Sequence, residues 1–591
     1  MNYLNIALII LLVCWIVFAF LSKQGILERY NISAFGPILM VRTMRGQKLL
    51  TVLAYPRRFW RFFGNVGIPM MVVGMFIMFM VVILTDYVML QALYDNAMPM
   101  PDKYNAPQNI FLIPGLNDYI PLVWGAIGLI VTLVVHELAH AVLCRTEGVS
   151  VKSMGALLLG IVPIGGFAEP DDEELFGKKE EPDPAGARDA GTGSNIGVGY
   201  DYAVRQPIET EGGIWHGNRS KTVVEQEGGD RVENENGVSR RARMRILAAG
   251  VMANFVVALI AFSLFFGPVL GGIAPVSDVM VVSVDENSVA AQAGIKENRA
   301  ITQVDNVTIK TAHDFYVTID TREDIPMTVH TKGADKRYVS TLAGEGATLQ
   351  TWVTIEEVMS DSAASRANLT KGMTIARIND TEIDNTTDFI AFLNTTVPGQ
   401  TVEVFFAENN STLVELGSSP ASDRSCGYLG VGSTTRIKFA GMTIGEYPAS
   451  GRLHIFKSIP GLMHRIESWL FIFAMPLIEL EGGRFAGFDN SMQFYEPVGW
   501  AAGYGVLVFW IASALLWIGW INFYAGLFNC LPAIPMDGGH VFKDIIHSLF
   551  GRVISDHYAE QLSKSIAVAF AVLILVSFIF MIFGPYMVYG F

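Results

Sequence analysis

The chain of 591 residues has little charge and few cysteines, and both shortages restrict what it can be. Only 17% of its residues are charged and 51% are apolar, a balance typical of membrane proteins. There are 42 Lys and Arg against 56 Asp and Glu, so the chain lacks the positive excess that would favour a nucleic-acid partner. Its four cysteines, three of them in or beside apolar stretches, indicate neither a disulfide framework nor a cysteine-based zinc site.

Long apolar runs are what the chain has instead. About 20 apolar residues cross a bilayer as a helix. Six stretches reach that length, at about 3–22, 67–93, 119–144, 246–272, 498–528 and 565–590. No basic residue precedes the first apolar core, so we interpret it as a retained span and not as a signal peptide. The sequence therefore predicts a polytopic α-helical membrane protein, in contact with lipid.

The distribution of Lys and Arg in the short flanks predicts the orientation of these spans. Residues 23–65 carry eight basic residues against one acid, which places them in the cytoplasm, with "FGPILMVRTMRG" and "YPRRFWRFFG" on the membrane surface. The basic run "RRARMR" at 240–245 falls on the same side. Residues 273–497 are then expected outside the cytoplasm.

Asparagine sequons provide a separate test of that orientation. Seven N-x-S/T patterns lie in the expected outer segment, at Asn306, Asn368, Asn379, Asn385, Asn394, Asn409 and Asn410. A surface domain with sequons and no disulfides is compatible with an archaeon, so the plasma membrane of a prokaryote is the expected location. Loops that are simply rich in Asn and Thr would produce the same pattern.

The expected outer segment contains an internal repeat. "SVAAQAGIKENRAITQVDNVTIKTAHDF" from Ser288 aligns without a gap with "SAASRANLTKGMTIARINDTEIDNTTDF" from Ser362, an offset of 74 residues. Each copy predicts a short helix, a strand, a tight turn and a second helix near Asp314 or Asp388. This pattern resembles PDZ domains of the protease-associated type, which bind extended peptides or C-termini, and "GYLGVG" at 427–432 resembles a carboxylate-binding loop. A plain α+β spacer is the alternative.

The fold class predicted from these features is a polytopic helical membrane protein with an inserted extracytoplasmic α+β tandem PDZ-like region. Residues 171–239 are rich in charge, Gly and Pro and are expected to form a flexible cytoplasmic loop, and 468–480 to form an interfacial helix. The expected segments are 1–118 (N-terminal spans and cytoplasmic amphipathic segment), 119–170 (a core span and membrane hairpin), 171–245 (loop), 246–274 (core span), 275–348 and 349–435 (the PDZ-like copies), 436–497 (linker), 498–545 (core span) and 546–591 (C-terminal span).

The run "VTLVVHELAHAVLC" at 131–144 places two histidines and a glutamate inside an apolar span. Positions i and i+4 share one face of a helix, so His136 and His140 can present two imidazoles to one zinc ion. Glu137 is placed to act as the general base on a zinc-bound water. Ionisable groups at the centre of a bilayer cost about 2.5–3.5 kcal/mol each, so a metal or a polar cavity is expected beside them.

A third ligand is expected in "NCLPAIPMDGGH" at 529–540, after the fifth span. Pro532 and Pro535 interrupt a continuous helix, and the glycines after Asp537 permit close backbone approach. Asp537 is the favoured ligand, with His540 as the alternative and Asp544 as a weaker one. Both motifs are expected near the cytoplasmic edge of the membrane, His136 about 13 Å inside it by helix rise.

These motifs resemble those of the site-2 proteases, intramembrane zinc proteases with HExxH on one span and N-x-x-P-x-x-x-D-G on a later one. The resemblance implies one zinc ion held by His136, His140 and Asp537, Glu137 as general base, and supporting roles for Asn529 and Pro532. "AAGVMANF" at 248–255 is similar to an element that would place Asn254 near bound substrate, although Val251 replaces the usual proline. For Asn254 an interhelical hydrogen bond explains the residue equally well. "PIGGFAEPDDEE" at 163–174 resembles the membrane hairpin, whose Gly165, Gly166 and Phe167 would pair with unwound substrate.

The function implied is cleavage of single-span membrane proteins near the cytoplasmic face, as in regulated intramembrane proteolysis. Three alternatives remain open at this stage. A zinc membrane protease acting on soluble or misfolded substrates would share every motif. A non-catalytic PDZ-bearing peptide-binding protein should show a damaged HExxH, which is intact here, and a transporter should show inverted repeats of spans.

Overall fold

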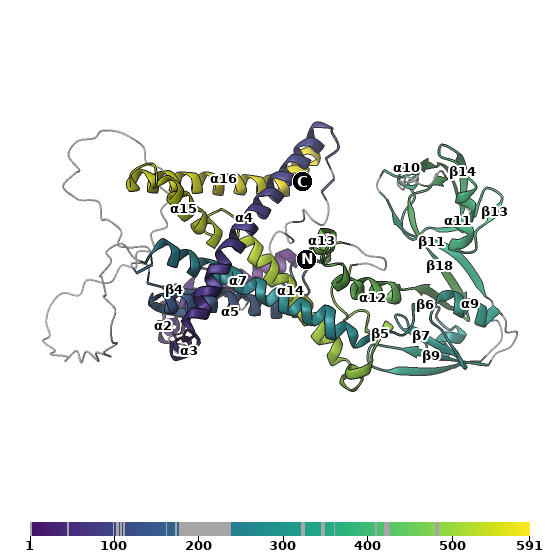
Figure 1. Cartoon of the computed structure of the whole chain (residues 1–591). Helices are drawn as coiled ribbons and strands as arrows, with labels where there is room; N and C mark the ends of the chain where they lie inside the picture. The colour runs from purple at the N-terminus through teal and green to yellow at the C-terminus, as the bar shows by residue number, and fades with distance from the viewer. Residues whose placement is uncertain are drawn as a thin grey trace.

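The computed structural model describes residues 3–43, 47–98, 100–101, 106, 109, 113–160, 162–171, 174–175, 238–320, 326–343, 349–359, 361–407, 410–418, 426–478 and 484–590. These residues form a helical bundle and a β-rich arm that extends from one end of the bundle (Figure 1). Most of the loop predicted at 171–239 lies outside the described residues.

Five helices are long and apolar enough to cross a membrane by length and composition. They are α4 (Arg57–Tyr94), α5 (Leu122–Glu147), α7 (Arg240–Leu264, continued by a π-helical segment, Phe265–Val269), α14 (Leu507–Asn529) and α16 (Asp556–Tyr589). Helix α1 (Tyr3–Lys23) is not among the five. Its part Leu11–Lys23 counts, among the described residues, as an apolar helix that is shorter than a membrane span. The N-terminal sixth span therefore stays a prediction.

Three predicted boundaries differ from the structure. The segment "YPRRFWRFFG" was expected on the membrane surface, but Arg57 begins α4 and the helix continues without a break. The basic run 240–245 was assigned to the loop, whereas it forms the first turns of α7 behind Ser239, whose side chain accepts from Ala242 N. The fifth span was expected from about 498, but α14 begins at Leu507, after a 3-10 helix (Gly499–Tyr504) and Gly505, which has a φ of 55°.

A four-stranded sheet lies against helix α5. Its order is β1 (Ile32–Phe35), β2 (Ile38–Thr43), β3 (Val151–Leu159) and β4 (Val162–Pro170), all antiparallel. The "FGPILMVRT" stretch expected on the membrane surface is thus largely strand β2, because β3 supplies a partner for its backbone. The hairpin predicted from the glycine-rich stretch is present as β3–β4. Small helices α2 (Ile26–Arg29) and α3 (Gln47–Leu53) accompany it.

The arm is built on one continuous twelve-stranded sheet. The first copy of the repeat forms β6 (Val279–Val284), α8 (Val289–Gln292), β7 (Ala300–Val304), β8 (Val307–Thr308), α9 (Ala312–Asp320), β9 (Met327–Lys332) and β10 (Arg337–Leu342). The second forms β11 (Gln350–Val358), α10 (Ala363–Arg366), β12 (Thr374–Ile378), β13 (Thr381–Glu382), α11 (Thr386–Asn394), β14 (Thr401–Phe406), β15 (Ser411–Glu415), β16 (Gly417–Ser418) and β17 (Gly427–Tyr428). The predicted order of short helix, strand, turn and helix is present in both.

The two copies are nested and not consecutive. The sheet order is β10-β9-β7-β6-β19-β18-β11-β12-β14-β15, in which β18 (Val431–Phe439) completes the second copy and β19 (Met442–Glu446) completes the first by pairing with β6. We call these units the first and second modules. The linker expected from 436 therefore begins later, because Ile437 and Met442 belong to the buried core of the first module.

Residues after β19 join the arm to the bundle. They form α12 (Ala449–Ser458), a 3-10 turn (Ile459–Leu462), α13 (Ile466–Ala474), a second 3-10 turn (Met492–Phe494) and β20 (Tyr495–Pro497), which pairs with β5 (Ile273–Pro275). Helix α13 occupies the stretch expected to form an interfacial helix. One buried cluster includes Phe265, Phe456, Tyr495 and Trp520, so the base of the arm and the bundle share a hydrophobic core.

Candidate metal centre

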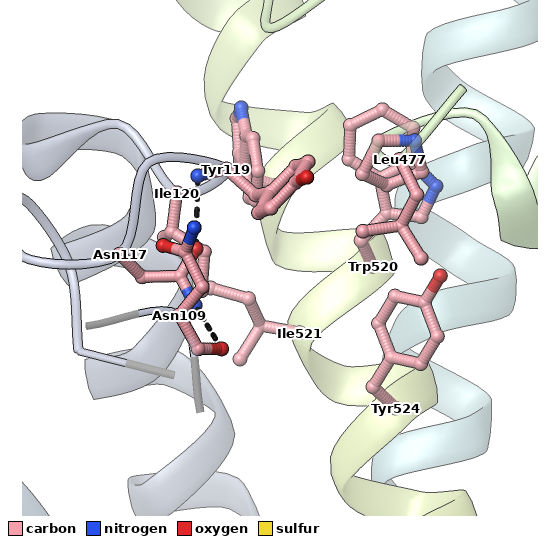
Figure 2. A pocket seen from close by; sticks show the side chains of 10 residues that line it. Asn109, Asn117, Tyr119, Ile120, Leu477, Trp520, Ile521 and Tyr524 are labelled. Carbon is pink, nitrogen blue, oxygen red and sulfur yellow. Dashed lines mark hydrogen bonds between the residues drawn. The ribbon is translucent and has the colours of Figure 1, made fainter. Parts of the chain in front are cut away.

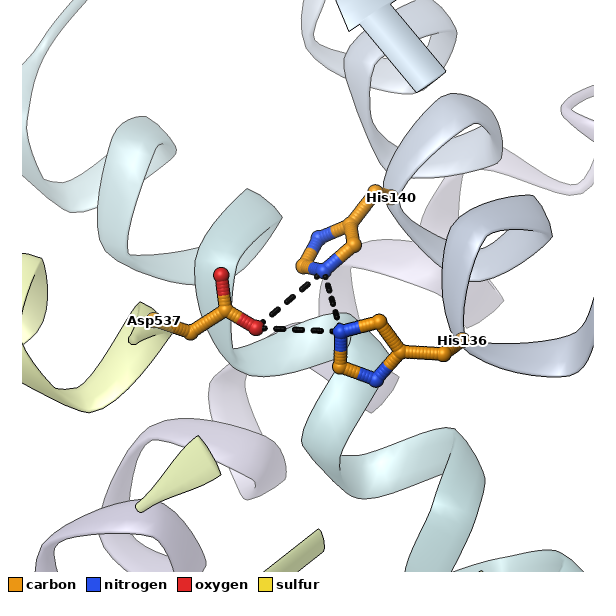
Figure 3. Close-up of side chains that lie close together, drawn as sticks. All are labelled: His136, His140 and Asp537. Atoms are coloured by element: carbon orange, nitrogen blue, oxygen red, sulfur yellow. Dashed lines mark hydrogen bonds and ion pairs between the residues drawn. The ribbon is translucent and has the colours of Figure 1, made fainter. Parts of the chain in front are cut away.

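Two helices bring the three expected ligands together. His136 and His140 lie one turn apart on α5, and Asp537 is the first residue of α15 (Asp537–Phe550). The two Nε2 atoms are 3.1 Å apart, and Asp537 Oδ2 lies 3.2 Å from each of them (Figure 3). Among the described residues, these three side chains form a group that could hold a metal ion.

The geometry of this triangle fits zinc. Bonds of about 2.0–2.1 Å in a tetrahedral site separate the ligand atoms by about 3.3–3.4 Å, close to the distances observed. Asp537 Oδ2 is buried and has no hydrogen-bonding partner among the described residues, although it faces two imidazole nitrogens. A cation shared by the three atoms would satisfy that oxygen, and its fourth position would remain open for water or substrate.

The backbone before Asp537 explains how α15 reaches α5. Helix α14 ends at Asn529, and the chain turns through a segment that contains the buried Pro532 before α15 begins. A Cβ atom on Gly538 would come 2.5 Å from the backbone of Cys530, and one on Gly539 would come 2.4 Å from the backbone of Ala533. The two glycines therefore let the start of α15 fold against the preceding turn, which fixes the position of the carboxylate.

Helix α7 supports both imidazoles from one face. His140 Nδ1 lies 2.8 Å from the carbonyl oxygen of Ile246, and His136 Nδ1 lies 3.1 Å from the side-chain nitrogen of Asn254. Between these positions is Gly250, where a Cβ would come 2.4 Å from His140 Nε2. The three α7 residues are four apart and share a face, so the helix approaches the histidines closely and offers a partner to each outer nitrogen.

A zinc ion held by His136 would set the orientation of the Asn254 amide. A histidine that binds zinc through Nε2 carries its proton on Nδ1 and needs an acceptor there. The amide oxygen of Asn254 is buried without a partner, whereas its nitrogen faces His136. With the amide oxygen turned toward His136, that oxygen accepts the Nδ1 proton, and each of these two groups then has a partner. The side chain was expected beside substrate or in an interhelical bond, and its contact is the interhelical one.

Glu137 connects α5 to the sheet hairpin. Its Oε2 atom accepts a hydrogen bond from Ala168 N of β4 at 2.7 Å. Phe167 pairs with Gly155 of β3, and its ring lies within 2.6 Å of where a Cβ on Gly155 would stand. Gly165 and Gly166 precede it in β4, in register with Leu157 and Ala156. The strand proposed to receive substrate therefore lies directly beside the carboxylate proposed as the base.

The other expected residues are less close to this centre. Asn529 is the last residue of α14, and its side-chain N–H donates to Ala525 O, one turn earlier in the same helix, at 3.0 Å. The buried Pro532 shapes the turn. His540, the alternative ligand, is not part of the metal-ligand group. Asp544, the weaker alternative, instead accepts two hydrogen bonds from Arg243 at 2.6 and 2.7 Å.

Buried ion pairs hold these helices in register. The Arg243–Asp544 pair joins α7 to α15, two turns from Asp537, and both side chains are at most 11% exposed. At the end of α5, Glu147 accepts from Arg245 at 2.9 and 3.0 Å and lies 3.3 Å from Arg61 of α4. Ion pairs thus join the four helices α4, α5, α7 and α15 around the centre. Arg243 and Arg245 belong to the "RRARMR" run, which the sequence analysis used to predict the orientation of the spans.

Sequence reasoning overlooked three contributors, namely the carbonyl of Ile246, Gly250 and the N–H of Ala168. The signal for Gly250 was available, since it lies in "AAGVMANF" four residues before Asn254. The other two are backbone groups, whose roles depend on the fold and not on residue type.

A cavity of about 160 Å³ lies elsewhere in the bundle (Figure 2). It is bordered by Asn117, Tyr119, Leu477, Trp520 and Tyr524 among others, and it adjoins the beginning of α5. Leu122 and His136 are separated by about 21 Å of helix rise, so this cavity is distant from the metal centre. No acid, histidine or cysteine is among its lining residues.

Comparison with known proteins agrees with this geometry. The model of peptidase family M50, the family of the site-2 proteases, matches residues 124–574, which include all three ligand candidates. The chain belongs to this family. As an M50 member it is a zinc metalloprotease, and its apolar helices make it an integral membrane protein.

Individual relatives match shorter parts. An uncharacterized protein of Methanocaldococcus jannaschii is 32% identical over 174 residues, 29% of this chain and 43% of that protein. The regulator of sigma-E protease RseP of Salmonella typhimurium is 23% identical over 353 residues, 55% of this chain and 75% of that protein. A protein of Agrobacterium fabrum, provisionally named a zinc metalloprotease, is 32% identical over 100 residues, 17% of this chain and 26% of that protein. The matches thus span less than half of two of these relatives and three quarters of the third.

Proposed function

We propose that this M50 protein is an intramembrane endopeptidase that cleaves single-span membrane proteins within their transmembrane helix, near the cytoplasmic face. The observation that carries the proposal is the triangle of His136, His140 and Asp537 on helices of the membrane bundle, with Glu137 beside it. Bound there, zinc supplies a Lewis acid that polarises the scissile carbonyl and acidifies water.

The residues of this chain perform the remaining steps. Glu137 takes the proton of the attacking water and passes it to the leaving amine. Its hydrogen bond from Ala168 N orients the carboxylate before substrate arrives. The carbonyl of Ile246 and the amide of Asn254 hold the two imidazoles with Nε2 toward the metal position. Each step thus has a positioned group within the bundle.

A helical substrate must unwind before it is cut, because its peptide groups are hydrogen-bonded to one another. Strand β4 ends the four-stranded sheet, so among the described strands nothing pairs with its outer edge. An unwound segment that pairs there would lie along Gly165, Gly166 and Phe167 and pass close to Glu137. This edge is the proposed substrate site.

The orientation proposed places the metal centre toward the cytoplasm and the arm outside. The positive charge of residues 23–65 and the sequons of the arm support it. In this arrangement the cytoplasmic fragment is released after cleavage, and the modules meet the outer part of a substrate before it reaches the metal centre.

The test is cleavage of a tagged single-span reporter by the purified protein in lipid nanodiscs. We expect a cytoplasmic fragment from the wild type, and none from Glu137→Gln or after chelation of zinc. Zinc content of Glu137→Gln should equal that of the wild type, because Glu137 is not a ligand. Equal cleavage by both proteins would refute the catalytic role, and cleavage of soluble casein but of no membrane reporter would refute the intramembrane substrate class.

A further inference from the structure

A pocket lies at the end of α5 that is remote from the metal centre. It has a volume of about 510 Å³ and is lined by Pro121, Leu122, Val123, Trp124, Asp489 and Trp510. The first four residues form the N-cap and first turn of α5, Trp510 lies in the first turn of α14, and Asp489 belongs to the segment between α13 and α14. The pocket is therefore located where α5, which carries two metal-ligand candidates, and α14, which precedes the third, both begin.

The chemistry of this pocket suits an organic cation. Among the described lining residues Asp489 is the only charged one, and its Oδ2 accepts a hydrogen bond from the indole N–H of Trp124. Asp489 makes no ion pair with any side chain that the structure describes. Indole rings attract cations over their faces, and a carboxylate attracts them by charge. A lysine or arginine side chain, which has an apolar stem and a charged head, matches such a lining.

One face of α5 connects this pocket with the proposed base. Val123, Ile130 and Val134 are 58%, 47% and 58% exposed, and they follow one another at intervals of seven and four residues. Glu137 comes three residues after Val134, so at about 3.6 residues per turn it continues the same stripe. Val123 and Glu137 are separated by about 21 Å of helix rise. A second helix that lay along this stripe would extend from the pocket to the base.

The opposite face of α5 is covered by the protein. Gly125, Gly128 and Thr132 lie opposite the stripe and are buried. A Cβ on Gly128 would come 2.8 Å from the carbonyl oxygen of Trp517, so α14 approaches this side of α5 closely. The stripe is thus a face of α5 that the described residues leave open to the membrane.

We infer that the pocket binds a lysine or arginine that flanks a substrate's transmembrane helix, while the helix itself lies along the stripe from Val123 to Glu137. This assignment rests on the proposed function, because only a membrane-spanning substrate would run beside α5 over this length. In the proposed orientation the pocket is at the outer surface, so the cation belongs to the outer flank of the substrate. A lipid amine headgroup carries the same charge, but the continuity of the stripe with Glu137 favours the substrate. Asp489 is then a residue that determines specificity.

The separation of the pocket from the base sets a spacing within the substrate. A rise of about 21 Å corresponds to about 14 residues of helix. Residues that unwind toward β4 span about 3.3 Å each instead of about 1.5 Å, so about four unwound residues shorten the spacing to about nine. The cation should therefore lie about 9–14 residues from the scissile bond.

The first test measures binding by the full chain carrying Glu137→Gln in nanodiscs, so that no cleavage occurs. The probe is a fluorescent single-span peptide of leucine and alanine, with a glycine pair near its cytoplasmic end and one lysine outward from that pair. A lysine about 12 residues from the glycines should bind about three- to tenfold more tightly than glutamine at the same position. A lysine about 4 or about 20 residues away should give no such gain. An equal gain at all three positions would overturn the inference.

Two matched variants separate the pocket from general electrostatic attraction. Asp489→Asn removes the charge but keeps an acceptor for Trp124, so the protein should fold and the advantage of lysine should disappear. Asp95→Asn changes another exposed acid, at the end of α4 opposite Arg57, and should leave the advantage intact. An advantage that survives Asp489→Asn would overturn the inference. An effect of Asp489→Asn that requires phosphatidylethanolamine and is independent of the lysine would assign the pocket to lipid and overturn it too.

Cleavage by the wild type separates this inference from the proposed function. Both the lysine and the glutamine peptide should be cut, because the metal centre does not need the cation, and the lysine peptide should have the lower KM. Cleavage of both peptides with equal KM would refute the role of the pocket alone. Lysine-dependent binding without cleavage of either peptide would refute the proposed function alone.

Discussion

Replacing Asn254 by leucine should lower zinc affinity without unfolding the protein. The two side chains are similar in volume, and the residue is fully buried. In the metal-free protein His136 can move its proton to Nε2 and needs no acceptor at Nδ1, but with zinc bound it cannot. The zinc-bound state alone would then contain a buried, unsatisfied N–H, which costs about 1–3 kcal/mol and corresponds to a loss of affinity of about 5- to 150-fold.

Competition with a chromogenic zinc chelator measures that affinity directly, and the visible spectrum of the Co²⁺-substituted protein reports the ligand field. Asn254→Asp keeps an acceptor toward His136 and should retain zinc at least as well as the wild type. If Asn254→Leu bound zinc like the wild type and lost only cleavage, Asn254 would act on substrate and the argument from the histidine proton would be wrong.

Three further predictions concern packing, buried charge and pH. Gly250→Ala places a methyl group 2.4 Å from the Nε2 of a ligand imidazole, so zinc content measured by atomic absorption should fall sharply, whereas Gly267→Ala, with nothing within 4 Å, should be neutral. Asp544→Asn removes the carboxylate that pairs with Arg243 in a buried position, which should cost about 3–5 kcal/mol and lower the thermal midpoint, while the double variant with Arg243→Met should recover much of the loss. Lys332 of β9 is 8% exposed, and burial, with repulsion from a neighbouring arginine, lowers its pKa from 10.5 to about 8. The unfolded arm therefore binds more protons between these values, and calorimetry of the arm transition should show stability rising from pH 8 toward 10.5. A midpoint that fell over that range would contradict the buried-lysine argument.

The grouping of His136, His140 and Asp537 could be predicted from the sequence because histidine and aspartate are recognisable metal-ligand types, and their role as zinc ligands stays a prediction. His136 and His140 share a helix face by their spacing. Asp537 comes after a turn that two prolines interrupt and is followed by two glycines. The three side chains could therefore be expected to meet once both spans were assigned their correct orientation in the membrane. The choice of Asp537 over His540 depended partly on the family resemblance. Backbone partners such as Ala168 N could not be foreseen, since every residue type has the same N–H.

Helices and the internal repeat were likewise predictable, whereas strand partners were not. Apolar length located five spans, and the gapless repeat located equivalent helices in both modules. The stretch around Met40 looked like a surface segment because its partner, β3, lies more than a hundred residues away. The nesting was missed for the same reason, because the repeat covers only the first part of each module and β19 has no recognisable counterpart at the offset of 74.

Nesting also sets the order in which the arm can be completed as the chain is made. Strand β6 must wait for β19, more than 150 residues later, and every strand of the second module is synthesised in between. A newly made chain can therefore finish the second module first, while the first exposes the edge of β6 until its last strand arrives. A lesion that delays the second module, such as a cavity at Ile355, should accordingly appear as degradation of the whole arm and not of one half.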